Sequence, residues 1–205
     1  MNNLSAIISK AAYYVKELFE QSLPIHLVFH SLEHTQNVVK GVQELCKHLT
    51  ITKQEKQILV LAAWFHDCGH TITYTGHEAV SQAIAYQFLS EQKVDIEVVS
   101  EVMNCIEATK MPQRPKNLLQ QIICDADLYH LSFTDYDDYE YLLRVEWDLI
   151  LNQTYTDEEW RNLNIVFLAQ HRYYTPYAKK KWEKRKRLNL QVLREQGEKK
   201  LRQTT

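Results

Sequence analysis

The segment 58–70, ILVLAAWFHDCGH, constrains the fold of this chain more than any other. It is apolar on nearly every side from Ile58 to Phe65, and a helix that is hydrophobic all round belongs in a protein core. The segment then continues with His66 and Asp67. Burying an imidazole beside a carboxylate costs free energy unless a partner compensates both groups. A metal cation is one such partner, because it binds imidazole nitrogen and carboxylate oxygen together.

The low glycine and proline content indicates long helices. Four glycines and four prolines in 205 residues leave few places for the tight turns that join many short strands. Apolar residues recur at three- and four-residue steps over 1–21, and capping-box patterns at Thr52 and Thr156 predict two helix starts. We therefore predict an all-α protein of about eight or nine helices. The expected later helices include one over about 116–131, one capped by Thr134, and one that begins at Thr175-Pro176.

Polar residues from three of these helices are expected to meet in the core. His34 lies on the apolar face of its helix, and His66 with Asp67 ends the central one. Asp127 continues an apolar stripe at four-residue steps that consists of Leu119, Ile123 and Leu131. Asp125 lies on a more polar side of the same helix, so we favour Asp127 as the carboxylate that enters the core. The mixture suits Mn, Fe or Zn better than calcium, and the alternative is a hydrogen-bonded cluster without metal.

The order of these residues carries a resemblance to a known family. His34, His66-Asp67 and Asp127 resemble the His…His-Asp…Asp signature of the HD superfamily of metal-dependent phosphohydrolases, an all-helical family. FHSLEHT at 29–35 is similar to the YHNxxH element of cyclic nucleotide phosphodiesterases, and AAWFHDCGH is similar to their HD helix. HEAVS, IEATK and DADLYHL resemble stretches of small bacterial HD phosphohydrolases. The resemblance covers about residues 25–175.

The resemblance implies a role for each of five residues. His34, His66, Asp67 and Asp127 are expected to bind one or two divalent ions, of Mn, Fe, Zn or Mg, and Asp67 is also expected to be catalytic. His30 corresponds to the histidine that protonates the leaving alkoxide. It precedes His34 by four residues, so the two would share a helical face if the helix begins early enough.

Further residues are candidates for contact with substrate or with a second ion. His70, His77 and Glu78 could bind either, although a His-Glu pair at a helix start also interacts favourably with the helix dipole. Lys110 could contact a phosphate group, or it could serve as a cation at a helix C-terminus. Arg144 and Glu146 are interpreted first as ion-pair scaffolding for the fold and only second as contacts to an anion.

The implied activity is hydrolysis of a phosphate mono- or diester in a nucleotide-like small molecule, by attack of metal-bound hydroxide on phosphorus. Ser31 and Phe29 replace the Asn and Tyr that are usual in the phosphodiesterase element. The acidic pair that follows HD in ppGpp hydrolases is absent, so that substrate is not favoured. Two alternatives remain: a di-iron HD-type oxygenase, with His70 and His77 as the nearby additional ligands, and a catalytically silent nucleotide-binding HD module.

The charge distribution bears on partners and location. Residues 171–205 hold 12 Lys and Arg against 3 Asp and Glu, although the net charge of the chain is −2. The run KKKWEKRKR at 179–187 is typical of nucleic-acid binding, but we interpret it as a solvated helix that lies on the acidic body, and we expect no nucleic-acid partner. No segment resembles a membrane span or a secretory leader, so we expect a cytoplasmic protein without membrane contact.

The chain length fits one domain. We expect an N-terminal helix over 1–24 that packs on the core, an HD domain over 25–175, and a basic helix over 176–205 that belongs to the same domain. The sequence leaves open whether the protein forms a homodimer.

Overall fold

The structure, a computed structural model, describes residues 3–204, with side chains described up to residue 197. Within this range the chain forms nine α-helices, two short 3₁₀ helices and no strand, which confirms the all-α prediction. The elements are α1 (Leu4–Ser22), α2 (Leu32–Cys46), α3 (Lys53–Phe65), η1 (Cys68–Thr71), α4 (His77–Glu91), α5 (Ile96–Thr109), α6 (Leu118–Asp127), η2 (Tyr129–Ser132), α7 (Tyr136–Leu151), α8 (Asp157–Gln170) and α9 (Pro176–Thr204). The outermost residues of the helices expected over 1–21 and 176–205 lie outside the described range.

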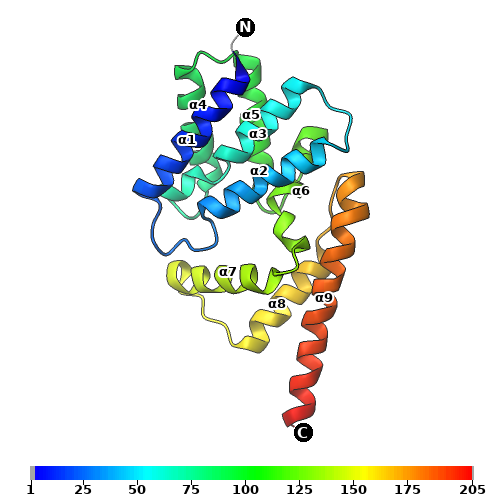
Figure 1. The fold of residues 1–205 in the computed structure, drawn as a ribbon. Coiled ribbons are helices and arrows are strands. Elements are labelled where there is room, and N and C mark those ends of the chain that lie inside the picture. Colours follow the sequence, from blue (N-terminus) through cyan, green and yellow to red (C-terminus); the bar gives the residue numbers. More distant parts are fainter. Residues whose placement is uncertain (1–2, 205) are drawn as a thin grey trace.

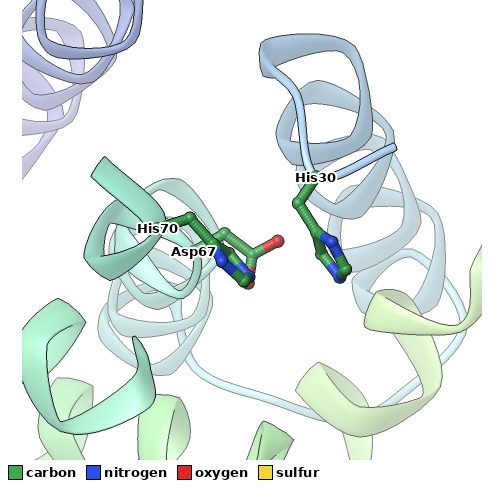
Figure 2. Close-up of side chains that lie close together, drawn as sticks. All are labelled: His30, Asp67 and His70. Carbon is green, nitrogen blue, oxygen red and sulfur yellow. The ribbon is translucent and has the colours of Figure 1, made fainter. Parts of the chain in front are cut away.

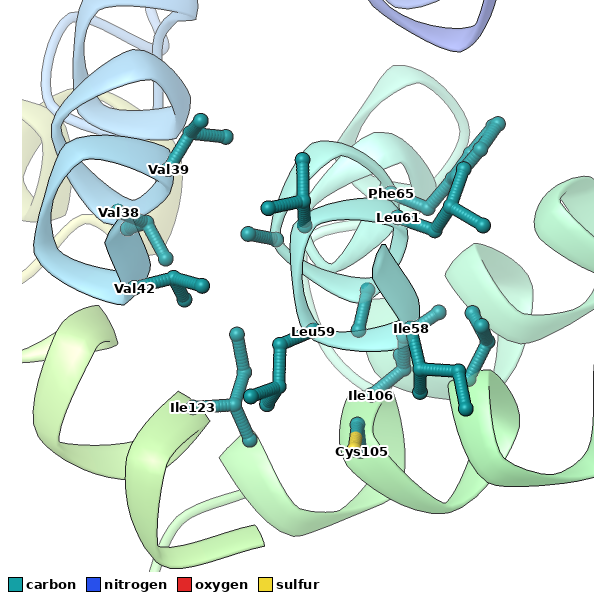
Figure 3. Packing of buried hydrophobic residues seen from close by; sticks show 14 of the residues in the cluster. Val38, Val39, Val42, Ile58, Leu59, Leu61, Phe65, Cys105, Ile106 and Ile123 are labelled. Carbon is teal, nitrogen blue, oxygen red and sulfur yellow. The ribbon is translucent and has the colours of Figure 1, made fainter. Parts of the chain in front are cut away.

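The central helix is α3, which packs against α1, α2, α5 and α6. Its residues Ile58 to Ala63 are all buried, because helices cover it on several sides. Figure 3 shows valines of α2 and Ile123 of α6 pointing toward α3 from different sides. The predicted capping box at Thr52 is confirmed: Thr52 Oγ1 accepts from Glu55 N at 3.1 Å, and Glu55 Oε2 accepts from Thr52 N at 2.6 Å. The C-terminal end of α3 therefore lies inside the core.

Two predicted helix boundaries are wrong. The helix expected over 116–131 is shorter, because α6 ends at Asp127 and the chain continues as the 3₁₀ helix η2. Thr134 does not cap α7, whose N-cap position is occupied by Asp135 without a side-chain hydrogen bond. Two acidic residues in the first turn of α7 instead interact with the positive end of the helix dipole. The capping box at Thr156 is confirmed.

The last three helices lie beside the bundle formed by α1 to α6 (Figure 1). α9 packs along α8 and against η2, and these elements share a small second core that consists of Leu131, Tyr136, Leu168 and Leu193. The basic helix also forms ion pairs within itself, since Glu183 accepts from Lys186 at 2.9 Å and from Arg187 at 3.2 Å. In the described part of the chain, no helix combines the length and the apolar character that a bilayer crossing needs.

A close backbone contact holds η1 against α4. A Cβ atom on Gly69 would lie 2.0 Å from the carbonyl oxygen of His77 and 2.9 Å from the backbone nitrogen of Ser81. Gly69 N also donates a hydrogen bond to Ser81 Oγ at 2.8 Å. Only a glycine allows this approach, which places the first turn of α4 next to the end of α3.

We predict that Gly69→Ala lowers the free energy of unfolding by at least about 2 kcal/mol, because the added methyl group would overlap backbone atoms that cannot move independently. Urea unfolding measures the loss. Gly197→Ala is the matched control: its Cβ would meet Arg161 at 3.7 Å, and the change should be neutral or stabilise by up to about 1 kcal/mol. Equal losses in both variants would contradict the close-contact explanation.

Candidate metal centre

Four side chains from three helices converge at the C-terminal end of α3. His34 Nε2 lies 3.3 Å from Asp67 Oδ2 and 3.4 Å from Asp127 Oδ1. His66 Nε2 lies 3.2 Å and 3.5 Å from the same two oxygens, and the two Nε2 atoms are 3.3 Å apart. We call His34, His66, Asp67 and Asp127 the four-residue cluster. The structure thus brings together all four residues that the sequence analysis selected as ligands.

The cluster contains a buried acceptor without a hydrogen-bond donor, which is Asp67 Oδ2. His66 Nδ1 lies 2.9 Å from the carbonyl oxygen of Ala63 and bonds to it only as a donor, so Nε2 of the neutral ring is an acceptor. Asp67 Oδ2 is buried and has no hydrogen-bond partner. Buried acceptors that face one another are costly unless a cation lies between them.

The electrostatics of the cluster favour a bound cation. Burial lowers the pKa of His34 and of His66, but the adjacent carboxylates outweigh burial, so both pKa values are raised, that of His66 strongly. Burial raises the pKa of Asp67 and of Asp127, but their contacts with the imidazoles outweigh it and both pKa values are lowered. Both carboxylates are therefore ionised at neutral pH and attract positive charge to the imidazole nitrogens.

The spacing of the cluster fits a divalent ion. Two ligand atoms at about 2.1 Å from one ion lie roughly 3.0 to 3.4 Å apart in octahedral or tetrahedral coordination. The separations within the cluster are 3.2 to 3.5 Å. Two neutral imidazoles and two carboxylates also carry the charge that balances a divalent cation. The orphaned oxygen of Asp67, the spacing and the donor set all agree with such an ion.

Asp125 was expected on a wetter face of α6, and this prediction is wrong. The residue is fully buried, whereas the Asp127 side chain is 16% exposed. Asp125 accepts hydrogen bonds from the backbone nitrogens of Tyr174 at 2.7 Å and Thr175 at 2.8 Å. Burial raises the pKa of Asp125 to about 6, although the two hydrogen bonds oppose that shift. Asp125 therefore connects α6 to the start of α9 and does not join the four-residue cluster.

His30 does not share a helical face with His34, contrary to expectation. α2 begins at Leu32, and Ser31 is its N-cap, whose hydroxyl accepts from His34 N. His30 precedes the helix, yet its ring still lies near the cluster, with 5.9 Å between the centroids of the His30 and His34 rings. The ring is held there by contacts from a distant part of the chain.

Glu146 of α7 makes those contacts, and sequence reasoning missed its role. Glu146 is fully buried, and its Oε2 accepts from the backbone nitrogens of Phe29 at 2.9 Å and His30 at 3.0 Å. Its Oε1 contacts His30 Nδ1 and accepts from Tyr74 Oη at 3.0 Å. The ion-pair role expected for Arg144 and Glu146 is found with other partners, since Glu146 contacts His30 and Arg144 bonds to Asp157 at 3.0 Å. Glu146 therefore fixes both the backbone and the ring of His30.

A second group of possible ligands adjoins the cluster through Asp67. Figure 2 shows His30 facing Asp67 and His70, and ligand atoms of these three residues lie within 4.8 Å of one another. Neither ring nitrogen of the buried His70 has a hydrogen-bond partner, and burial lowers the pKa of His70 to about 2. The ring stacks on His77, whose Nε2 lies 3.4 Å from Asp67 Oδ1. The two oxygens of Asp67 thus face different groups.

The cluster opens into a cavity of about 550 Å³. His30, His77 and Glu78 line it near the cluster, while His70 lies behind His77 and Lys110 is an exposed residue at the end of α5. His130 also lines the cavity and was not selected from the sequence, although it lies in the DADLYHL stretch. Burial, with the nearby His34, lowers the pKa of His130 to about 3, so its ring is neutral.

Comparison with known families agrees with this geometry. A family profile described as HD domain matches residues 31–132. No curated protein and no solved structure gives a significant match. The matched segment contains the four-residue cluster, but it contains neither His30 nor Glu146.

We predict that Asp127→Asn weakens divalent-metal affinity by at least tenfold, because it removes one anionic ligand from the cluster. Asp125→Asn should leave the affinity within about twofold and instead lower the free energy of unfolding by about 1 to 3 kcal/mol, because an amide nitrogen would face a backbone N–H. Calorimetric Mn²⁺ titration and urea unfolding measure the two effects. The reverse order of metal affinities would transfer the ligand role to Asp125.

Proposed function

This chain belongs to the HD superfamily of metal-dependent phosphohydrolases, and on that premise we propose that it hydrolyses a phosphate mono- or diester of a small molecule. The convergence of two imidazole nitrogens and two carboxylate oxygens at the end of α3 carries the proposal. The nucleotide-like substrate expected from the sequence remains a prediction. The size of the adjoining cavity, about 550 Å³, is in the usual range for a small-molecule site.

His34, His66, Asp67 and Asp127 would hold the divalent ion, for which Mn, Fe, Zn and Mg are candidates. When bound, such an ion lowers the pKa of a water molecule and offsets negative charge that develops on phosphoryl oxygens. Asp67 has a central position, since its Oδ2 faces both imidazoles of the cluster and its Oδ1 faces His77. It is therefore the side chain whose loss should affect both groups of ligands.

His30 is the proposed general acid. Its Nδ1 is held by Glu146, so Nε2 is the ring nitrogen left to donate a proton, and the residue lines the cavity. A water molecule loses one proton to solvent, its oxygen becomes bonded to phosphorus, and the bond from phosphorus to the ester oxygen breaks. The alcohol leaves with the proton from His30, and solvent then returns a proton to His30. Glu146 acts through His30 as a positioning residue, because its carboxylate orients the ring and stabilises the imidazolium.

A second ion, and with it a di-iron oxygenase, is the other candidate function. The observation that favours it is His70, whose two buried nitrogens have no partner beside Asp67 and His30. A count of metal ions per chain together with an iron absorption spectrum separates the two functions. One redox-inert ion supports the hydrolase, and two coupled irons would support the oxygenase.

The direct test is incubation of the purified protein with Mn²⁺ and a panel of mononucleotides, cyclic nucleotides and nitrophenyl phosphate mono- and diesters. We expect metal-dependent cleavage of at least one ester, abolished by chelation and by Asp67→Asn. A folded, metal-loaded protein that cleaves no member of the panel would instead be a catalytically silent module.

We predict that His30→Ala slows hydrolysis of an alkyl phosphate ester by roughly 10²- to 10⁴-fold while the metal content is unchanged. The loss should be less than about tenfold for nitrophenyl esters, because nitrophenolate leaves without a proton. Steady-state rates on the two ester types measure the difference. Equal losses on both types would remove His30 from the role of general acid.

We predict that Glu146→Gln lowers kcat by at least about tenfold, because the ring of His30 loses the carboxylate that orients it. KM should change less than kcat. Arg144→Gln on the same helix is the control and should preserve kcat. A loss of folding stability without a fall in kcat would mean that Glu146 supports only the fold.

A further inference from the structure

The outer part of the cavity differs chemically from the metal centre. Beyond the cluster, α7 and α8 supply an apolar wall that consists of Leu143, Trp147, Trp160, Leu163, Val166 and Phe167. Among the residues that the structure describes, no lysine or arginine lines the cavity. Positive charge near the site would therefore come from the metal centre and the histidines.

The polar groups of Asn164 and Trp160 in this wall are already bonded within the protein. Asn164 Nδ2 donates to the carbonyl oxygen of Trp160 at 3.0 Å and to Glu140 Oε2 at 3.3 Å, while its Oδ1 accepts from Tyr136 Oη at 2.6 Å. Trp160 Nε1 also donates to Glu140. The hydroxyl of Thr109 donates to a carbonyl oxygen of its own helix at 2.8 Å. Among these polar side chains, the exposed amide of Gln170 at the end of α8 remains to contact a polar ligand, while the rest of the wall is apolar.

Two cations of neighbouring elements, Arg144 of α7 and Lys110 at the end of α5, do not line the cavity. Arg144 donates to Asp157 Oδ1 at 3.0 Å and contacts the carbonyl oxygen of Tyr155. Lys110 is exposed and does not line the cavity. A second phosphate group would bring further negative charge into an apolar wall without a partner, which is costly.

We infer that the substrate carries one phosphate group on an uncharged, apolar organic group, such as an aromatic ring or an alkyl chain of several carbons, which packs against Trp147 and Trp160. The inference rests on the proposed hydrolysis and specifies its substrate class. The two indole rings meet edge to face, with centroids 5.4 Å apart at 85°, and Glu140 holds one of them, so the wall is preformed. Hydrolysis of such an ester yields phosphate and an apolar alcohol or phenol.

The first test uses a series of esters whose leaving alcohols have similar acidity: methyl, butyl, hexyl and benzyl phosphate, with AMP and ADP for comparison. With the Mn²⁺-loaded full-length protein, kcat/KM should rise at least tenfold from methyl to hexyl phosphate, because each buried methylene contributes a severalfold gain. AMP and ADP should lie below hexyl and benzyl phosphate. A flat series, or a preference for AMP or ADP, would overturn the inference.

The second test measures binding without turnover. Hexylphosphonate should bind the Mn²⁺-loaded protein at least tenfold more tightly than methylphosphonate in calorimetry, with a negative heat-capacity change that marks apolar burial. Val166→Gln should reduce hexylphosphonate affinity about fivefold and leave methylphosphonate within twofold. Leu149→Gln is the matched control, since Leu149 has a similar exposure, 48% against 51% for Val166, and does not line the cavity.

The two tests separate failure of the substrate class from failure of the activity. If no ester is cleaved, including nitrophenyl phosphate, the proposed hydrolysis fails, and the phosphonate affinities still decide whether the apolar wall binds such a group. If esters are cleaved but the two phosphonates bind equally, the hydrolysis stands and the inference about the organic group is wrong. Equal effects of Val166→Gln and Leu149→Gln would likewise contradict it.

Discussion

Two imidazole nitrogens and two carboxylate oxygens face one another at the buried end of α3, and the candidate site depends on this arrangement. α3 is covered by α1, α2, α5 and α6, so His66 and Asp67 are buried. The same covering helices supply His34 and Asp127 at 3.2 to 3.5 Å from them. A cation removes the repulsion among the lone pairs, and the resulting attraction then contributes to the stability of the folded chain. Packing of the helices and binding of an ion would thus stabilise the same arrangement.

The residues of the proposed site come from two regions of the chain. The segment that matches the HD domain, residues 31–132, holds the four-residue cluster and His70 with His77. The residues around it hold the proposed proton donor His30, the buried Glu146 that fixes it, and the apolar wall of α7 and α8. The first region holds the residues proposed to bind a divalent ion, which could act on many different esters. The second supplies the groups that would choose among leaving groups, which is where members of one superfamily can differ.

The sequence predicted those features that depend on a short segment of the chain. The capping boxes at Thr52 and Thr156 and the apolar segment of α3 are local patterns, and they identified the all-α fold and the buried end of α3 correctly. Contacts between distant segments were not predictable in the same way. Glu146 lies 116 residues from His30, and no local pattern in the sequence indicates that the two residues meet. The side of α6 that carries Asp125 looked polar, but the turn before α9, 49 residues further along, covers it.

The most direct test of this account is the metal content of the protein itself. Elemental analysis after expression with Mn, Fe and Zn supplementation should find at least one divalent ion per chain in the wild type. His66→Ala and Asp67→Asn should lose that ion, and the wild type should unfold at a lower temperature after chelation, because the metal binds the folded state. A folded wild-type protein that contains no metal after supplementation, and whose melting temperature chelators do not change, would contradict the central role of the cation.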